Sequence, residues 1–276
     1  MEGYQPENLK GALEIKASKS PEILAGGTDF MLKFRKQASD VLFVSHLKEL
    51  RGIERENEYL IIGAATTLNE LERSKEIPTI FKDIISKMAP PAIRYVATIG
   101  GNICNASPAG DTLPFLYALD TKLIIGSLHS QREVSIEDFI KGPGEIDIAK
   151  DELPLQIKLP LQLIEKLHSR AFNVQFYRKV GTRRENALSK LSFLGIAEIS
   201  EEIKDVRIAF GAVAPTIVRS REIEERIKDG AASDEILTMY SKLITPIDDQ
   251  RSTTFYRKTV SLRLLKYFLS LLITSY

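Results

Sequence analysis

Residues 23–31 decide the fold. They read Ile23-Leu24-Ala25-Gly26-Gly27-Thr28-Asp29-Phe30-Met31. This order predicts a short strand over 23–25, a glycine turn and a helix that begins at Phe30. Consecutive main-chain N–H groups at such a turn form a positively polarised nest that suits a diphosphate. Asp29 would repel phosphate unless its side chain turned back onto helix N–H groups. The alternative is a helix N-cap without a ligand, because glycine turns are common.

A second glycine-rich stretch lies further along the chain. It reads Thr98-Ile99-Gly100-Gly101-Asn102-Ile103-Cys104-Asn105-Ala106-Ser107-Pro108-Ala109-Gly110-Asp111. The composition predicts a long irregular loop from Gly100 to Pro114, and loops of this length are often functional. Asn102 can donate and accept hydrogen bonds, and Asp111 can accept two from sugar hydroxyls, so the mixture suits a ribose, ribityl or phosphate ligand. A purely structural loop is the alternative.

The composition indicates a globular protein of about two domains. The chain has 276 residues, of which 43% are hydrophobic and 27% charged, and these values argue against long disorder. Lysine and arginine number 38 against 37 acids, so a net charge of +1 gives no field for nucleic acid or an anionic membrane. Cys104 is the single cysteine and cannot hold an iron–sulfur cluster by itself. Any metal redox centre would therefore sit on another chain.

Neither end of the chain carries a targeting or membrane pattern. Residues 1–10 lack a basic segment followed by an apolar run, which predicts a cytoplasmic protein. The apolar stretch from Leu262 to Ile273 contains Arg263 and Lys266 and is shorter than the roughly 20 residues of a membrane span. We predict a closing amphipathic helix there and no membrane span.

Short strands and helices alternate in the first half. The patterns predict strands at 41–44, 59–62, 122–126 and 155–159 and helices at 66–74, 79–88 and 113–119, with Thr67 and Thr79 as caps. A composition break near Pro160 suggests a domain boundary. The second half reads as α+β, with a strand at 206–213 and helices at 222–227 and 234–244.

A basic run follows the apolar residues 172–177. It reads Arg178-Lys179-Val180-Gly181-Thr182-Arg183-Arg184-Glu185. Lys179 could contact a ligand, although a solvated basic face is the usual explanation of such a run. The chain contains neither G-x-G-x-x-G nor G-x-x-x-x-G-K-[ST], which disfavours an ordinary Rossmann or P-loop site. His46, His129 and His168 have no partner at metal-ligand spacing, so no metal site is predicted.

Three segments in this order resemble the flavin subunit of the molybdenum hydroxylases, the family of xanthine dehydrogenase and aerobic carbon monoxide dehydrogenase. They are 24–31, then 97–102 with Ala106-Ser107-Pro108 and Asp111, then 179–184. Further likeness appears in Phe210-Gly211-Ala212-Val213-Ala214-Pro215 and in Pro246-Ile247-Asp248-Asp249-Gln250-Arg251-Ser252-Thr253 with Tyr256-Arg257. Each motif is weak alone, but five in register cover nearly the whole chain.

The resemblance implies an α+β fold of the vanillyl-alcohol-oxidase type (PCMH type), in two subdomains followed by a smaller α+β domain. The FAD-binding domain would cover residues 1–162, and the C-terminal domain of the flavin subunit would cover 163–276. The segment around Asp248 and Asp249 would be structural rather than acid–base machinery.

The resemblance also assigns cofactor contacts position by position. Main-chain N–H groups of 24–31 would wrap the FAD diphosphate, and those of 98–102 would form the second half of the cradle. Asp111 would hold a polar arm of the cofactor, Lys179 would lie near the flavin, and Leu153 would make an apolar or backbone contact. The implied FAD-binding residues are Leu24, Ala25, Gly26, Gly27, Thr28, Asp29, Phe30, Met31, Thr98, Ile99, Gly100, Gly101, Asn102, Asp111, Leu153 and Lys179.

The implied function is electron transfer within a multisubunit oxidoreductase. FAD, held noncovalently, would take electrons from [2Fe–2S] clusters on a small partner subunit and pass them to NAD or another acceptor, while the molybdenum cofactor sits on a large partner subunit. No side-chain general base is required, so no catalytic residue is assigned. Cys104 would be an apolar filler rather than a reactive thiol. The alternative is a noncatalytic FAD-binding or assembly module of the same fold.

Overall fold

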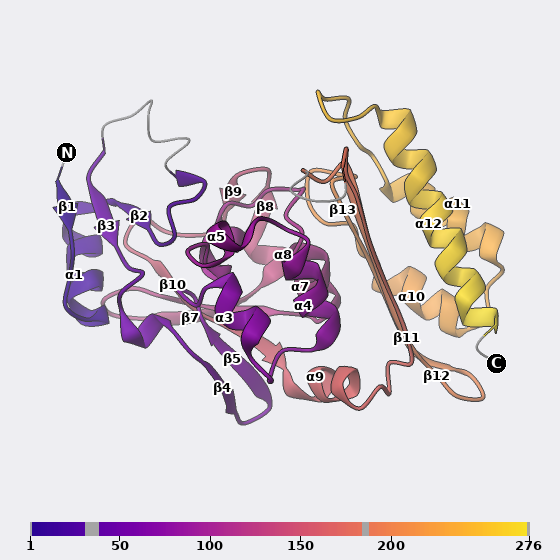
Figure 1. The fold of residues 1–276 in the computed structure, drawn as a ribbon, viewed down its shortest axis with the longest axis horizontal. Helices are drawn as coiled ribbons and strands as arrows, with labels where there is room; N and C mark the ends of the chain where they lie inside the picture. The colour runs from indigo at the N-terminus through magenta and orange to yellow at the C-terminus, as the bar shows by residue number, and fades with distance from the viewer. Residues whose placement is uncertain (1, 31–38, 184–187, 275–276) are drawn as a thin grey trace. The chain divides into compact units, whose positions relative to one another are not determined.

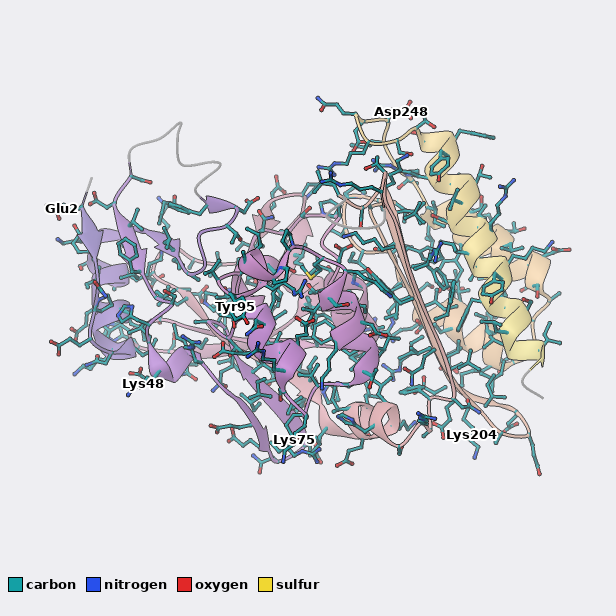
Figure 2. All side chains as sticks on the ribbon, viewed as in Figure 1. Glu2, Lys48, Lys75, Tyr95, Lys204 and Asp248 are labelled. Carbon is teal, nitrogen blue, oxygen red and sulfur yellow. The ribbon has the colours of Figure 1, made fainter. Side chains whose placement is uncertain are left out.

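The structure is a computed structural model that describes residues 2–30, 39–183 and 188–274. The chain divides into two compact units (Figure 1). The first contains residues Met1–Ile77, Ala89–Ala106 and Asp120–Gln162, and the second contains Pro78–Met88, Ser107–Leu119 and Leu163–Tyr276. Exposed lysines such as Lys48, Lys75 and Lys204 point outward from their units (Figure 2). The second unit therefore takes in two short segments that precede residue 163.

A small parallel sheet begins the first unit. Its strand order is β1 (Gly3–Tyr4), β3 (Val41–Phe43), β2 (Glu22–Leu24), and both neighbouring pairs are parallel. Helix α1 (Leu9–Lys19) connects β1 to β2 and packs on β3, where it buries Ala12 and Leu13 beside Leu42. Strand β2 ends at Leu24, so the glycine turn leaves from the carboxyl edge of this sheet.

The second sheet of this unit is antiparallel. Its order is β4 (Ile53–Glu56), β5 (Tyr59–Gly63), β10 (Leu153–Pro160), β6 (Lys122–Gly126), β7 (Gln131–Ser135). In β10 every second residue from Leu153 to Leu159 is buried, as expected when one face of a strand meets a core. The pairing of β10 with β6 shifts register between Pro154 and Gln156. Short helix α8 (Ile136–Phe139) and the hairpin β8 (Ile140–Gly142) and β9 (Glu145–Ile146) follow β7.

Short helical elements complete the first unit. They are the 3₁₀ turn η1 (Lys48–Leu50), α3 (Leu68–Arg73), α5 (Pro91–Arg94) and α6 (Ile99–Cys104). The prediction that Thr67 caps a helix is confirmed, because Thr67 and Glu70 form a capping box at the start of α3. The prediction of an irregular loop from Gly100 is wrong for 100–104. Thr98 caps these residues into α6 despite their two glycines, because its hydroxyl accepts the Gly101 N–H.

The second unit is built on a three-stranded antiparallel sheet, β11 (Val174–Val180), β12 (Leu191–Ile199), β13 (Ile203–Gly211). Helix α12 (Thr254–Thr274) packs on β12, α10 (Arg221–Lys228) packs on β13, and α11 (Ser233–Leu243) packs on α12. Helix α7 (Leu113–Ala118) also contacts β12 and β13, while α4 (Thr79–Ser86) contacts β11. Helix α9 (Leu161–His168) leads into β11. Phe193, Phe210 and Phe268 form the aromatic centre of this core.

Two predicted elements need correction in this unit. Thr79 is the first residue of α4 and Pro78 is its N-cap, so Thr79 makes no cap. The closing helix starts at Thr254 rather than Leu262. Its first turns include Arg257 and Ser261, which are polar yet buried, so the hydrophobic pattern does not reveal them.

Candidate cofactor-binding site

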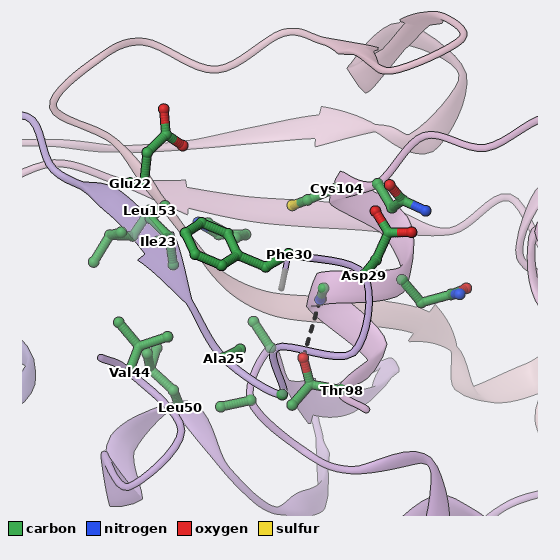
Figure 3. A pocket seen from close by; sticks show the side chains of 18 of the residues that line it. Glu22, Ile23, Ala25, Asp29, Phe30, Val44, Leu50, Thr98, Cys104 and Leu153 are labelled. Carbon is green, nitrogen blue, oxygen red and sulfur yellow. Dashed lines mark hydrogen bonds between the residues drawn. The ribbon is translucent and has the colours of Figure 1, made fainter. Parts of the chain in front are cut away.

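A cavity of about 440 Å³ lies in the first unit. Figure 3 shows it from close by. Residues of α1, β2, the glycine turn, α6 and the start of β10 line it. From the predicted set the lining includes Ala25, Gly26, Gly27, Thr28, Asp29, Phe30, Thr98, Gly100, Gly101, Asn102 and Leu153. The fold thus brings together two loops that are about 70 residues apart in the sequence, together with Leu153.

Four predicted residues that the structure describes do not line this cavity. Leu24 is the last residue of β2, and its carbonyl accepts the Val44 N–H at 3.0 Å. Ile99 is fully buried in the core. Met31 lies outside the described residues. Asp111 and Lys179 belong to the second unit.

The first loop presents free main-chain donors to the cavity. The N–H groups of Gly26, Gly27 and Thr28 make no hydrogen bond to any described residue. Gly27 adopts φ 70°, a left-handed conformation that favours glycine. A Cβ on Gly26 would lie 2.0 Å from the Val96 carbonyl oxygen, so close packing of the backbone requires that glycine. This turn fits the nest predicted for a diphosphate.

In the second loop the main-chain N–H groups of residues 99–102 are already hydrogen-bonded within the fold, so they do not supply the predicted second half of the cradle. The N–H of Ile99 donates to Thr66 O at 3.0 Å, and that of Gly100 donates to Ala64 O at 2.9 Å. The Gly101 N–H donates to Thr98 Oγ1 at 3.1 Å, marked by the dashed line in Figure 3. The Asn102 N–H closes the helix by donating to Thr98 O. Residues 98–102 therefore form a wall of the cavity, on which Gly101 is exposed.

One end of the cavity is apolar. Ile23, Val44, Leu50 and Leu153 line it, and Figure 3 shows the Phe30 ring directed into the cavity. An apolar wall of this kind suits a flat ring system, whereas the glycine turn suits phosphate. The described residues thus offer the two environments that a dinucleotide such as FAD requires.

Among the described residues, four charged side chains line the cavity: Lys16, Glu22, Asp29 and Glu152. Glu152 accepts hydrogen bonds from Arg132 Nε at 2.8 Å and Arg132 Nη2 at 2.9 Å, and this contact lowers the pKa of its carboxyl. The predicted helix that would receive the Asp29 side chain falls mostly on residues 31–38, which lie outside the described residues. Lys16 was not predicted, because no local pattern in the sequence marks this lysine of α1 as buried.

Cys104 also lines the cavity. The residue is partly exposed as a whole, but the surroundings of its sulfur are dense, and burial raises the pKa of the thiol to about 12. Such a thiol is protonated at neutral pH and a poor nucleophile.

Asp111 and Lys179 form a buried ion pair in the second unit. Lys179 Nζ lies 2.7 Å from Asp111 Oδ2 and donates a second hydrogen bond to Lys87 O at 3.0 Å. Ser189 Oγ donates to Asp111 Oδ1 at 2.5 Å. Burial raises the pKa of Asp111, and the contacts with Lys179 and Ser189 oppose this shift. Asp111 and Lys179, two of the residues predicted to touch the cofactor, are therefore brought together and form an ion pair with each other.

The described part of the chain carries neither a metal-binding cluster nor a membrane-spanning helix. No three or more His, Cys, Asp or Glu side chains gather there in a way that could hold a metal ion. No described helix is long and apolar enough to cross a membrane.

Two family models and several known proteins match the chain. The family model described as "FAD binding domain in molybdopterin dehydrogenase" matches residues 1–162, and "CO dehydrogenase flavoprotein C-terminal domain" matches 176–272. The glyceraldehyde dehydrogenase medium chain of Sulfolobus acidocaldarius is 31% identical over 268 residues, covering 92% of each chain. The xanthine dehydrogenase FAD-binding subunit of Escherichia coli O157:H7 is 29% identical, covering 95% of this chain and 90% of that one.

The fold is also found among solved structures. Quinoline 2-oxidoreductase from Pseudomonas putida 86 contains a chain that superposes with a TM-score of 0.87 at 18% identity, covering 100% of this chain and 97% of that one. The expected α+β fold, an FAD-binding domain with a C-terminal domain, is confirmed.

The fold and the family matches define a class: the flavin subunits of multisubunit oxidoreductases. Within that class, the chain belongs to the family of FAD-binding subunits of the molybdenum hydroxylases.

Proposed function

We propose that the chain binds one FAD noncovalently and passes electrons from [2Fe–2S] clusters on a partner chain to NAD or another acceptor. The observation that carries the proposal is the set of three main-chain N–H groups at Gly26, Gly27 and Thr28, which line the cavity without a partner among the described residues. Free N–H groups at a glycine turn are what a diphosphate needs.

The residues of this chain bind and orient the cofactor in this proposal. The glycine turn holds the diphosphate, the apolar end encloses one ring system, and Gly101 leaves the wall of α6 open to the ligand. FAD supplies the ability to exchange electrons singly with clusters and in pairs with an acceptor such as NAD. We further propose residues 1–162 as the FAD-binding domain and 163–276 as the C-terminal domain.

Three further assignments stay predictions. They include contacts of Asp111 and Lys179 with the cofactor and a cytoplasmic location. A small [2Fe–2S] subunit and a large molybdenum-cofactor subunit are the expected partners. The support for these partners is that Cys104 is the only cysteine of the chain, so the clusters need another chain.

Reconstitution with FAD tests the binding step. The full chain is purified, incubated with FAD and desalted, and its visible absorbance is recorded before and after denaturation. We expect a flavin spectrum and release of intact FAD on denaturation, because the link is noncovalent. A colourless protein, even after refolding with FAD, would refute the proposal.

A second preparation, the intact complex, separates electron transfer from a noncatalytic module. The intact complex is purified from its native source and mixed anaerobically with NADH or with the reducing substrate of the complex. Bleaching of the flavin absorbance supports electron transfer. An FAD that stays oxidised under both conditions favours the assembly module.

A further inference from the structure

Lys16 is a buried cation in the wall of the cavity. It lies on α1 with 8% of its surface exposed, and it is the only lysine or arginine among the described residues that line the cavity. Lysine is almost never this buried unless it has partners that offset the loss of water. We therefore expect the Lys16 ammonium to find hydrogen-bond acceptors on the side that faces the cavity.

The Lys16 ammonium has N–H donors that no described residue accepts. Its ammonium donates to Pro21 O at 2.8 Å and makes no other hydrogen bond to a described residue. An ammonium group has three N–H donors, so two remain. The carboxylates of Glu22 and Asp151 lie close enough to favour its charged form, whereas burial lowers the pKa of Lys16.

The surroundings of Lys16 identify the kind of ligand. Ile23 and Leu153 line the same cavity beside it and belong to its apolar end, whereas the phosphate-binding turn at Gly26–Thr28 follows β2. An apolar wall with one buried donor suits a flat heteroaromatic ring that carries acceptor nitrogens. A phosphate bound at Lys16 would instead have to leave the free N–H groups of the turn unused.

We propose that Lys16 donates a hydrogen bond to a ring nitrogen of the adenine of FAD and so selects the adenosine end for the apolar part of the cavity. This inference rests on the proposed binding of FAD. Adenine takes no part in the redox reaction of FAD, so it can be enclosed beneath α1, whereas the flavin must remain within reach of electron donors and acceptors on other molecules. Adenine N1, N3 and N7 are acceptors without a proton and match the unused donors of Lys16.

The test compares variants of the full chain freed of flavin. Lys16→Met keeps the length of the side chain and removes the donor, and Lys10→Met on the same helix is the matched control because the Lys10 side chain is 80% exposed. Dissociation constants for FAD and ADP are measured by titration calorimetry, and that for inorganic pyrophosphate by competition with FAD. We expect Lys16→Met to weaken FAD and ADP about tenfold and to leave pyrophosphate binding unchanged.

The three ligands separate the explanations. Unchanged ADP affinity in Lys16→Met overturns the inference, because Lys16 would then contact no part of adenosine. Equal weakening of ADP and pyrophosphate also overturns it, because that pattern indicates a distorted cavity. If Lys16→Met does not fold, Lys16→Gln is judged by the same comparison. A wild-type chain that binds no FAD refutes the proposed function, whereas a wild-type chain that binds FAD and a Lys16→Met variant with normal ADP affinity refute only the role of Lys16.

Discussion

Glycines serve three different purposes around the cavity. Gly27 adopts a left-handed φ, and Gly26 and Gly100 allow backbone from Val96 and Ala64 to approach. Gly101 differs, because it is exposed and a Cβ there would meet only Thr98 Oγ1, at 2.9 Å. A side chain at Gly101 would therefore extend into the cavity instead of into the core.

We predict that Gly101→Leu lowers FAD affinity at least about a hundredfold, because the new side chain occupies space that the ligand needs. Gly11→Leu on α1 is the control, since Gly11 is also helical and lies outside the cavity. Flavin fluorescence titration measures the affinity, and circular dichroism checks that both variants fold. Full retention of FAD by Gly101→Leu would contradict the placement of the ligand against α6.

The Glu152 carboxylate predicts a dependence of stability on pH. Its contact with Arg132 lowers its pKa in the folded chain, so the stabilisation is present above the pKa of the unfolded chain, about 4.3, and is lost as the pH falls through the lower folded value. Glu152→Gln should lower the free energy of unfolding by about 1 kcal/mol at pH 7. Urea unfolding between pH 7 and pH 3 should show the difference from wild type shrinking. Glu54→Gln, at an exposed position, should show no such trend.

Helix caps position the elements that surround the cavity. Thr67 begins α3 and Thr98 begins α6, and each side chain accepts the N–H of the third residue beyond it. The two threonines also pair as an isolated antiparallel bridge. The start of α6 is thereby held beside α3, which fixes where the wall formed by residues 98–102 lies.

Thr67 and Thr79 form a matched pair for testing how much the capping box stabilises the fold. Thr67→Ala removes a capping box and should lower the free energy of unfolding by about 1 kcal/mol. Thr79→Ala should change it by only about 0.5 kcal/mol or less, because Thr79 is exposed and caps no helix. Equal effects of the two substitutions on the urea midpoint would show that the capping box adds nothing.

The second unit is assembled from three separate segments of the chain. Asp111 comes from 107–119, Lys179 and Ser189 come from 163–276, and the Lys87 carbonyl comes from 78–88. One buried polar cluster therefore ties the two early segments to the later part of the chain. Because both charges have only 9% of their side-chain surface exposed, losing one would leave the other buried without an opposite charge.

We predict that Lys179→Met lowers the free energy of unfolding by about 3 kcal/mol in the flavin-free chain, because it leaves the Asp111 carboxylate unpaired. The double variant Asp111→Asn with Lys179→Met should recover part of the loss, since no buried charge remains. Urea unfolding of the three proteins measures the coupling. Purely additive losses would mean that the two side chains do not stabilise each other.

Local patterns in the sequence were sufficient for many elements. The strand and glycine turn at 23–28, the cap at Thr67 and the strand at 122–126 follow from neighbouring residues, because propensity, periodicity and capping act within a few positions of the chain. The same patterns identified the two glycine-rich loops as candidate ligand contacts, and the order of the motifs indicated the family.

Other features depend on partners that are distant in the sequence. Carbonyls of Ala64 and Thr66 take the N–H groups of α6, the ion pair joins Asp111 to Lys179, and Lys16 is enclosed in the cavity wall. A backbone N–H looks the same in any sequence whether a carbonyl or a ligand accepts it, and a lysine looks the same whether water or protein surrounds it. Only packing across the fold decides between these states, which is why the sequence by itself determined the elements and the family, and the tertiary structure determined which donors remain for the cofactor.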